Sequence, residues 1–296
     1  MSVTVAGAAL AIHPGALGDV LLAIPALRAL RAAGARVVLA AQPRLARLLL
    51  ALGEIDDARD IDALGLAALF AGEGAARLPA VGRVVSWFGA RDPEFARRLA
   101  RLAADVIVAS SVAPDRDVWR HLLATVGGDA DVRPSGVPDA IVQEGRAALK
   151  AAGWDGARRV LVVQPGAGSP AKRWPPEAFA AALAGADAQI VLHRGPADAD
   201  AVAALSARVP DALTLDEPPL TALAGALARC AAYVGNDSGV SHVAATVGAP
   251  SVILYAAPNL AWRPWSPAPR VLTVAMARAH SADVDAVRRA LRGLLG

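Results

Sequence analysis

The strongest constraint on the fold is an alternation of short apolar strands and amphipathic helices, which runs through the chain twice. In the first run the pattern predicts strands at Val3–Ile12, Val37–Ala41, Ile55–Ile61, Val81–Trp87 and Asp105–Ala109, and helices at Asp19–Ala33, Pro43–Leu52 and Pro93–Ala103. Such alternation is typical of parallel sheets whose strands are joined by crossover helices. We therefore expect an α/β protein.

A break in the pattern divides the chain. Gly127–Pro138 is rich in Gly, Asp and Pro and lacks apolar periodicity, so it is interpreted as a linker. The alternation then restarts, with strands predicted at Val160–Gln164, Gln189–His193, Ala212–Leu215, Tyr233–Gly235 and Ser251–Tyr255, and helices at Asp139–Ala152, Pro176–Ala184, Ala197–Arg208, Leu220–Cys230, Ser238–Val247 and Ser281–Leu295. The sequence thus predicts two doubly wound domains, residues 1–138 and 139–296.

The amino-acid composition fits this interpretation and also indicates the cellular compartment of the protein. Apolar residues make up 55% of the chain and charged residues 19%, which is enough to bury a full core. No apolar run approaches the roughly 18–20 residues of a membrane-spanning helix. Val3–Ile12 lacks a preceding basic flank, so it is interpreted as a strand rather than a signal peptide. The single cysteine, Cys230, excludes an internal disulfide and suits a reducing compartment, so we expect a cytoplasmic protein.

The net charge is only +3, but arginines cluster in the first domain, at Arg28, Arg31, Arg36, Arg44 and Arg47 and at Arg91, Arg97, Arg98 and Arg101. Basic patches attract phosphates, anionic lipid or nucleic acid. The alternative is a solvated helix face. Aromatic residues are not interleaved with the basic ones, so no nucleic-acid partner is predicted.

The first motif, Pro14–Val20, follows the first predicted strand, where open α/β sheets place ligands. Gly15 and Gly18 permit a tight turn and a close approach of a ligand to the backbone, and the N–H groups at the helix start could take an anion. Asp19 has two interpretations, a helix cap or a general base in a cleft. The glycine spacing differs from that of a dinucleotide-binding fingerprint.

The second motif, Gln164–Pro175, also follows a strand. Its small residues let the backbone approach a phosphate, Ser169 offers a hydroxyl, and Lys172 offers a point charge. The alternative is a surface loop with two solvated bases, Lys172 and Arg173.

The third motif, Gly235–His242, again joins a strand to a helix. Asp237 or Ser238 can cap the helix, and an anion site is expected from the N–H groups of Gly239, Val240 and Ser241. His242 lies on the first turn, beside any bound phosphate, or is a structural histidine. The motifs contain no His/Cys cluster, so no protein metal site is predicted. A diphosphate could be held by these N–H groups and Lys172, with one solvated Mg²⁺.

Together the segments PGALGDVLLAIPALRALR, QPGAGSPAKRWPPEAFAAALA and VGNDSGVSHVAATVGAPSVILY resemble the heptosyltransferases of glycosyltransferase family 9, in the family's order. The resemblance implies a GT-B fold, with two Rossmann-like domains facing across a cleft and a last helix that packs back on the first domain. It also implies an inverting transfer of heptose from ADP-heptose to the inner core of lipopolysaccharide, a lipid A–core acceptor at the inner membrane.

The resemblance also assigns site residues. It implies that Asp19 is the base for the acceptor hydroxyl and that Lys172 binds donor phosphate. The diphosphate would be surrounded by Asp237, Ser238, Gly239, Val240, Ser241 and His242, with Gly18 and Ser169 also on the nucleotide-sugar side. Asp198 aligns loosely with an acid that could hold the ribose. His13 stands where the family commonly has Lys or Arg, and is expected on the acceptor side.

The expected chemistry requires no covalent intermediate and no bound cofactor, because one base and a stabilised leaving group suffice. The first-domain arginines are expected to make peripheral contact with the inner face of the inner membrane. Two alternatives stay open. One is another GT-B activity, with a different nucleotide-sugar donor or an epimerase reaction. The other is a noncatalytic protein that binds a sugar nucleotide, which the His13 departure and the compact first domain favour.

Overall fold

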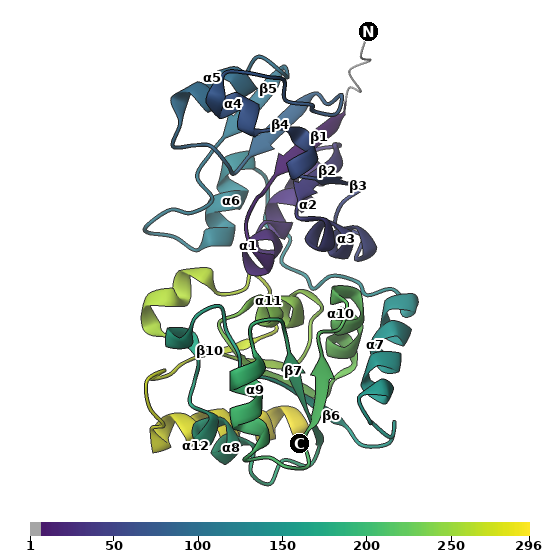
Figure 1. Ribbon diagram of the computed structural model, residues 1–296, viewed down its shortest axis with the longest axis vertical. Helices are drawn as coiled ribbons and strands as arrows, with labels where there is room; N and C mark the ends of the chain where they lie inside the picture. The colour runs from purple at the N-terminus through teal and green to yellow at the C-terminus, as the bar shows by residue number, and fades with distance from the viewer. Residues whose placement is uncertain (1–6) are drawn as a thin grey trace. The chain divides into compact units, whose positions relative to one another are not determined.

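The computed structural model describes residues 7–296, and the chain splits into two compact units, Met1–Val132 and Arg133–Gly296 (Figure 1). The division falls inside the predicted linker. Each unit is an α/β unit around one parallel sheet, which confirms the predicted fold class. The predicted cleft between the two units stays a prediction.

The first unit follows the predicted order of strands and helices. Its elements are β1 (Ala8–Ile12), α1 (Leu17–Leu22), α2 (Ile24–Ala32), β2 (Arg36–Ala41), α3 (Pro43–Ala51), β3 (Asp57–Asp60), the 3-10 turn η1 (Asp62–Leu64), α4 (Ala67–Ala71), β4 (Arg83–Ser86), α5 (Pro93–Leu99), β5 (Asp105–Val108) and α6 (Val118–Val126). The predicted start of the first strand at Val3 lies outside the described residues. The sequence prediction omitted α4 and α6.

The first sheet has the strand order β3-β2-β1-β4-β5, with all pairs parallel. This is the Rossmann order, in which the winding direction reverses between β1 and β4. One face of the sheet, including Leu10, Ile12 and Val84, packs against Phe95 and Leu99 of α5. The carboxyl end of β1 therefore lies beside the reversal point, and the Pro14–Val20 turn begins there.

The helix predicted at Asp19–Ala33 is interrupted. α1 ends at Leu22, Ala23 separates the two helices, and Pro25 lies in the first turn of α2. Proline has no N–H to donate and its ring clashes with the carbonyl four residues earlier, so the helix restarts at the proline. The restart confines the turn that carries Asp19 to a helix of six residues.

The second unit repeats the plan. It contains α7 (Asp139–Ala151), β6 (Val160–Gln164), the 3-10 turn η2 (Pro170–Lys172), α8 (Pro176–Leu183), β7 (Gln189–Arg194), α9 (Ala199–Ser206), β8 (Leu213–Asp216), α10 (Leu220–Arg229), β9 (Ala232–Asn236), α11 (Gly239–Thr246), β10 (Ser251–Tyr255), the 3-10 turn η3 (Ala257–Trp262), β11 (Arg270–Thr273) and α12 (Ser281–Leu295). The order β11-β10-β9-β6-β7-β8 is again parallel and reverses between β6 and β9.

The core of the second unit lies on the sheet face covered by α8, α9 and α12 (Figure 1). Alternate strand residues such as Leu161, Val163 and Leu254 point to this face, as a period of two requires. The contacts described for α12 are with α8, β9 and β10 of its own unit, and the prediction that it returns to the first unit stays a prediction. α12 begins at Ser281, as predicted, and His280 occupies its N-cap position.

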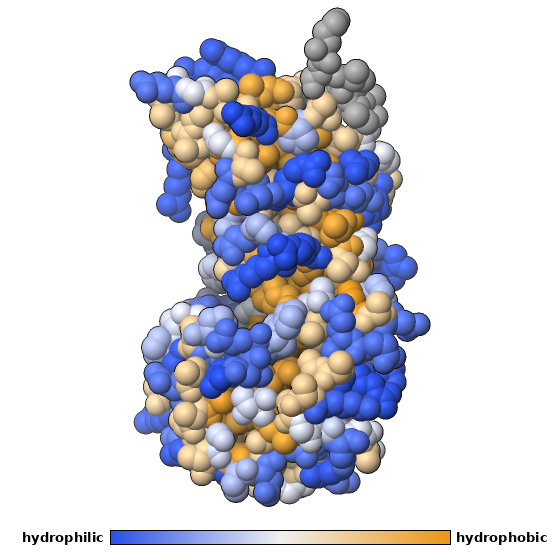
Figure 2. Space-filling view, turned by 45° about the vertical axis from the view of Figure 1, so that its right-hand side comes forward, coloured by the Kyte–Doolittle hydropathy of each residue, from blue (hydrophilic) through white to orange (hydrophobic). Residues whose placement is uncertain are grey.

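Hydrophilic and apolar side chains are interspersed over the face of both units shown in Figure 2. Part of the predicted basic cluster is not at the surface. The Arg28 guanidinium donates two hydrogen bonds to the Glu54 carboxylate, at 2.6 and 2.8 Å, and both side chains are largely buried. Arg31 and Arg36 form ion pairs with Asp56 and Asp57. Among the described residues, no helix is long and apolar enough to cross a membrane.

Candidate functional site

The three predicted motifs occupy the carboxyl ends of strands at the two reversal points. The first motif follows β1, and the other two follow β6 and β9, which are neighbours in one sheet. Gln164 pairs in register with Gly235, so the loops after these two strands start side by side. In open α/β sheets the reversal point is where ligands bind, outside the carboxyl ends of the strands.

Asn236 joins the second and third motifs. This residue is fully buried at the end of β9. Its side-chain amide donates to the Pro165 carbonyl at 2.8 Å, and its side-chain oxygen accepts from the backbone N–H of Trp174 at 3.1 Å. One side chain thus holds both ends of the loop that carries Ser169 and Lys172. Asn236 was not predicted as a site residue, although a buried amide at the end of a central strand was a usable signal.

The same loop places a cation against the third motif. Lys172 closes η2, and its Nζ lies 2.7 Å from Oδ2 of Asp237. The Asp237 side chain is buried, whereas about a third of the Lys172 side chain is exposed. The contact is an ion pair without the angular geometry of a hydrogen bond. Asp237 therefore orients an ammonium group that solvent or a ligand can still reach.

The start of α11 offers two backbone donors. Within residues 7–296, no acceptor lies against the N–H groups of Gly239 and Val240. The N–H of Ser241 donates to Oγ of the N-cap residue Ser238 at 3.4 Å, so this N–H is not available to an anion as the sequence predicted. An eight-residue helix with two open N–H groups and a nearby ammonium group is a suitable environment for phosphate.

The Ser241 hydroxyl is used inside the protein. It donates to the Asn236 carbonyl at 2.5 Å and accepts from the Tyr233 hydroxyl at 2.8 Å. Burial raises the pKa of Tyr233, so this phenol stays protonated and keeps donating. Ser241 therefore attaches the first turn of α11 to β9, and the structure gives its side chain a supporting position.

His242 is buried on the first turn of α11. Burial, and to a lesser extent the nearby Lys172 charge, lowers its pKa from 6.5 to about 4. The imidazole is therefore neutral at physiological pH. A neutral ring beside Lys172 can donate or accept one hydrogen bond without adding a second cation to the site.

A buried polar network supports the loops after β6 and β7. Oδ2 of Asp198 accepts from the Gln164 side-chain amide at 2.9 Å and from the Gly195 N–H at 3.0 Å. His193 Nδ1 lies 2.5 Å from Oε1 of Gln164, and burial lowers the His193 pKa to about 4. A neutral Nδ1–H therefore donates to the Gln164 oxygen. Gln164 and His193 were not predicted as site residues, because their partners come from different strands.

Asp198 is tightly enclosed. Its side chain is 7% exposed, and a Cβ atom built on Gly166 would lie 1.8 Å from its Oδ1. The carboxylate thus fixes the turns at Gly195 and Gly166. Its predicted contact with a ribose stays a prediction.

In the first unit, His13 and Asp19 organise the Pro14–Val20 turn. His13 Nδ1 accepts from the Gly15 N–H at 3.1 Å, and Oδ2 of Asp19 accepts from the Ala16 N–H at 3.1 Å. Two N–H groups that the sequence offered to an anion are therefore occupied by side chains. Asp19 is the third residue of α1 and reaches back to its start, so it does stabilise the helix end, and it remains half-buried at the reversal point.

His13 lies beneath this turn. It is 1% exposed, its ring centroid is 5.7 Å from that of Trp87, and burial lowers its pKa to about 4. Because Nδ1 accepts a hydrogen bond, the proton of the neutral ring is on Nε2, which has no hydrogen-bond partner among residues 7–296. A Cβ on Gly15 would lie 2.6 Å from the His13 ring and 2.7 Å from Cβ of Asp19, so only glycine fits between them.

The structure therefore brings Ser169, Lys172, Asp237, Ser238, Gly239, Val240 and His242 to one edge of the second sheet. Gly18 and Asp19 share α1 in the first unit. No group of three or more His, Cys, Asp or Glu side chains in the described part of the chain is arranged to hold a metal ion.

Two Rossmann-ordered units, with a phosphate-suited helix start at the reversal point of the second, are the units of the GT-B class of glycosyltransferases. Residues 115–290, more than half of the chain, match the model of glycosyltransferase family 9 (heptosyltransferase). The chain belongs to this family.

The similar proteins agree with this assignment. Lipopolysaccharide heptosyltransferase 3 of Escherichia coli is 30% identical over 180 residues, which are 51% of this chain and 52% of that protein. The match thus spans about half of the curated relative. The family 9 glycosyl transferase of Veillonella parvula superposes with a TM-score of 0.75 at 18% identity, covering 100% of this chain and 98% of that one. For the Escherichia coli ADP-heptose lipopolysaccharide heptosyltransferase II the TM-score is 0.73 at 22% identity, covering 97% and 98%.

Proposed function

We propose that the chain is an inverting glycosyltransferase that moves a heptose from ADP-heptose to an inner-core acceptor of lipopolysaccharide. The observation that carries the proposal is the donor side of the second unit. There the Lys172 ammonium, oriented by Asp237, lies beside the open N–H groups of α11. The proposal is also supported by family membership and by a solved Escherichia coli heptosyltransferase whose structure contains ADP.

In the donor site, the diphosphate of ADP-heptose binds to Lys172 and to the N–H groups of Gly239 and Val240. These groups offset the negative charge that develops on the departing ADP. The Ser169 and Ser238 hydroxyls, both half-buried, complete the phosphate contacts, and neutral His242 adds one hydrogen bond. Asp198 contributes to the ribose side of the donor site by fixing the turns at Gly195 and Gly166.

In the reaction, Asp19 removes the proton from an acceptor hydroxyl. The oxygen forms a bond to the anomeric carbon of heptose as the bond from that carbon to the ADP oxygen breaks. The configuration at the anomeric carbon inverts, the proton stays on Asp19, and ADP leaves as the diphosphate. Gly18 leaves room for the donor beside the base. The half-buried position of Asp19 at the reversal point of the first sheet supports this role.

His13 acts on the acceptor side through the turn that it holds, since its imidazole is buried beneath Gly15. No bound cofactor is required, and a solvated Mg²⁺ on the diphosphate is the one metal in the proposal. A transfer assay in EDTA tests the metal: retained activity removes Mg²⁺ from the mechanism.

Because the proposed acceptor lies in the inner membrane, the enzyme would act in the cytoplasm, at the inner face of that membrane. Arg28 cannot contribute to membrane contact because it is paired with Glu54 inside the first unit. Arg44 and Arg47 of α3 are exposed, as is Leu50, the next residue at the same spacing. We assign the peripheral contact to this side of α3. Sedimentation with anionic vesicles tests it: an Arg44→Gln, Arg47→Gln double variant should remain in the supernatant.

The transfer itself is tested by incubating the protein with ADP-heptose and a heptose-free lipid A–Kdo acceptor. The proposal predicts a mass gain of one heptose, found by mass spectrometry. Parallel reactions with other nucleotide sugars separate the alternatives. Transfer from a different donor, or interconversion of a donor without an acceptor, would replace the proposed reaction by another GT-B activity. Tight ADP binding without any transfer would identify a noncatalytic binding protein.

A further inference from the structure

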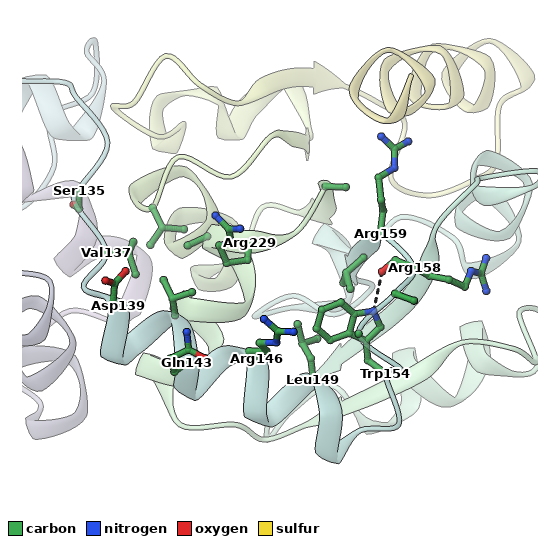
Figure 3. Close-up of a pocket in the computed structure, with 17 residues that line it drawn as sticks. Ser135, Val137, Asp139, Gln143, Arg146, Leu149, Trp154, Arg158, Arg159 and Arg229 are labelled. Atoms are coloured by element: carbon green, nitrogen blue, oxygen red, sulfur yellow. Dashed lines mark hydrogen bonds between the residues drawn. The ribbon is translucent and has the colours of Figure 1, made fainter.

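The second unit carries a groove away from the donor-side loops. It measures about 870 Å³ and runs along α7 (Figure 3). It is also lined by Val160, the first residue of β6, by Ala231, which precedes β9, and by Val247, which follows α11. Parallel strands begin at one edge of a sheet and end at the other. The groove therefore lies at the amino edge, opposite the ends that carry Lys172 and α11.

The lining of the groove is cationic. Four arginines contribute to it, Arg146, Arg158, Arg159 and Arg229, against one carboxylate, Asp139. Two of these guanidinium groups are engaged elsewhere: Arg158 donates to the Ala188 carbonyl at 3.0 Å, and Arg159 donates to the Leu295 carbonyl. The guanidinium groups of Arg146 and Arg229 make no hydrogen bond or ion pair with any residue of the described range 7–296.

The packing of two helices places these two arginines near each other. α7 and α10 touch backbone to backbone, because a Cβ on Gly145 would lie only 2.1 Å from the Ala226 nitrogen. Arg146 follows Gly145, and Arg229 lies about one helical turn beyond Ala226. Figure 3 shows both side chains between Asp139 at one end of the groove and Trp154 at the other. Both side chains are exposed and line the same groove, so a bound anion would be attracted by both guanidinium groups.

The groove also has an apolar side. The Trp154 indole donates its N–H to the Arg158 carbonyl at 2.8 Å, which fixes the ring, and Leu149 and Val142 line the wall nearby. An aromatic ring held in this way offers a flat surface to a ligand group. The volume lies within the range of about 300–1,000 Å³ that is typical of ligand pockets.

We propose that this groove binds a phosphate-bearing ligand, with the phosphate held by Arg146 and Arg229 and the remainder of the ligand packed against Trp154. Guanidinium groups match phosphate oxygens in pairs, which favours a phosphate over a carboxylate of lower charge. The ligand is a soluble phosphorylated compound or the headgroup of an anionic lipid. The site is independent of the donor site, since it lies at the other edge of the sheet.

The test uses inorganic pyrophosphate and the full chain carrying Lys172→Ala, which weakens the donor site. Isothermal titration calorimetry should detect pyrophosphate binding that weakens roughly tenfold for each of Arg146→Gln and Arg229→Gln. Binding should also weaken as salt is raised, because the site is open to solvent. The matched control is Arg289→Gln, an exposed arginine of α12 outside the groove, which should leave the affinity unchanged.

A second arm distinguishes the sources of phosphate. Vesicles that contain phosphatidylglycerol are sedimented with the chain carrying Lys172→Ala and with the same chain carrying also Arg146→Gln and Arg229→Gln. If only pyrophosphate binding depends on the two arginines, the ligand is a soluble phosphorylated compound. If vesicle binding depends on them, it is a lipid headgroup. The proposal is overturned if both pyrophosphate affinity and vesicle binding stay within about twofold of the Arg289→Gln control. Heptose transfer by the double variant with Lys172 intact should be unaffected, so this outcome is separate from the proposed enzyme activity.

Discussion

Gly166→Ala is expected to lower both the stability of the protein and its affinity for ADP. Gly166 lies in the loop after β6, and the added Cβ would lie 1.8 Å from Oδ1 and 2.2 Å from Cγ of Asp198. These distances are far below van der Waals contact, so one of the two groups must move. Asp198 cannot move freely, because its other oxygen accepts from Gln164 and Gly195 and the side chain is 7% exposed. The φ angle of Gly166 is not positive, so alanine causes no backbone strain of its own.

The size of the loss in stability follows from the hydrogen bonds to Asp198 that a movement of its side chain would break. Hydrogen bonds to a charged group contribute about 1.5–3 kcal/mol each. If the loop of Gly166 moves and Asp198 stays in place, part of the hydrogen-bond energy of Asp198 is retained. We expect a loss of about 2–4 kcal/mol in the free energy of unfolding. For a unit of this size, that corresponds to a fall in Tm of roughly 5–15 °C. ADP affinity should fall as well, because the same loop carries Lys172.

The assay is thermal unfolding by circular dichroism together with calorimetric titration of ADP. Gly168→Ala is the matched control, because Gly168 lies in the same loop and a Cβ there meets nothing within 4 Å. Asp198→Ala added to Gly166→Ala removes the clash, so the two changes should be less than additive. If Gly166→Ala has the same Tm and ADP affinity as Gly168→Ala, the contact between Gly166 and Asp198 does not constrain the donor-side loop.

Three further outcomes are expected. Lys172→Ala should weaken ADP binding roughly tenfold or more, measured by calorimetry, and unchanged affinity would remove Lys172 from the donor site. The folded-state pKa of His242, about 4, lies below its ordinary 6.5, so the unfolded chain binds more protons in that window. Stability should therefore fall as the pH drops from about 6.5 to 4, by up to roughly 3 kcal/mol for this residue. His242→Asn should reduce this fall, measured by chemical unfolding at each pH, and an unchanged profile would show that His242 titrates normally. Burial raises the pKa of Cys230 to about 12, so a thiol reagent should label it at neutral pH only after unfolding; rapid labelling of the native protein would contradict its burial.

Much of the fold could be predicted because its strands are continuous apolar runs. β6 and β10 have the predicted bounds, since buried parallel strands consist of runs such as Val160–Gln164 and end at polar or proline residues. The break after Leu22 was also available from Pro25. The helix α6 was missed although Trp119, Leu122 and Leu123 have helical spacing, and β11 was missed because a half-exposed edge strand has little apolar contrast.

The candidate site was predictable only in part. Position after a strand identifies the loop that carries Lys172 and the start of α11, because this loop and this helix follow the apolar runs of β6 and β9. Which polar side chains remain available to a ligand depends on hydrogen-bond partners from distant parts of the chain. Ser241 is used by Tyr233 and Asn236, and Asp198 by Gln164, and no local pattern shows that these oxygens are already occupied. The two N–H groups taken by His13 and Asp19 are a further example.

The role of Asp19 as general base is tested most directly by comparing heptose transfer and ADP affinity in the wild type and in Asp19→Asn. Asparagine has nearly the same shape but cannot take a proton, and a general base contributes about 10²–10⁴-fold to a rate. We expect a loss of transfer in that range, with ADP affinity unchanged because the contacts proposed for ADP belong to the second unit. Transfer at the wild-type rate by Asp19→Asn would contradict the role of Asp19 as general base.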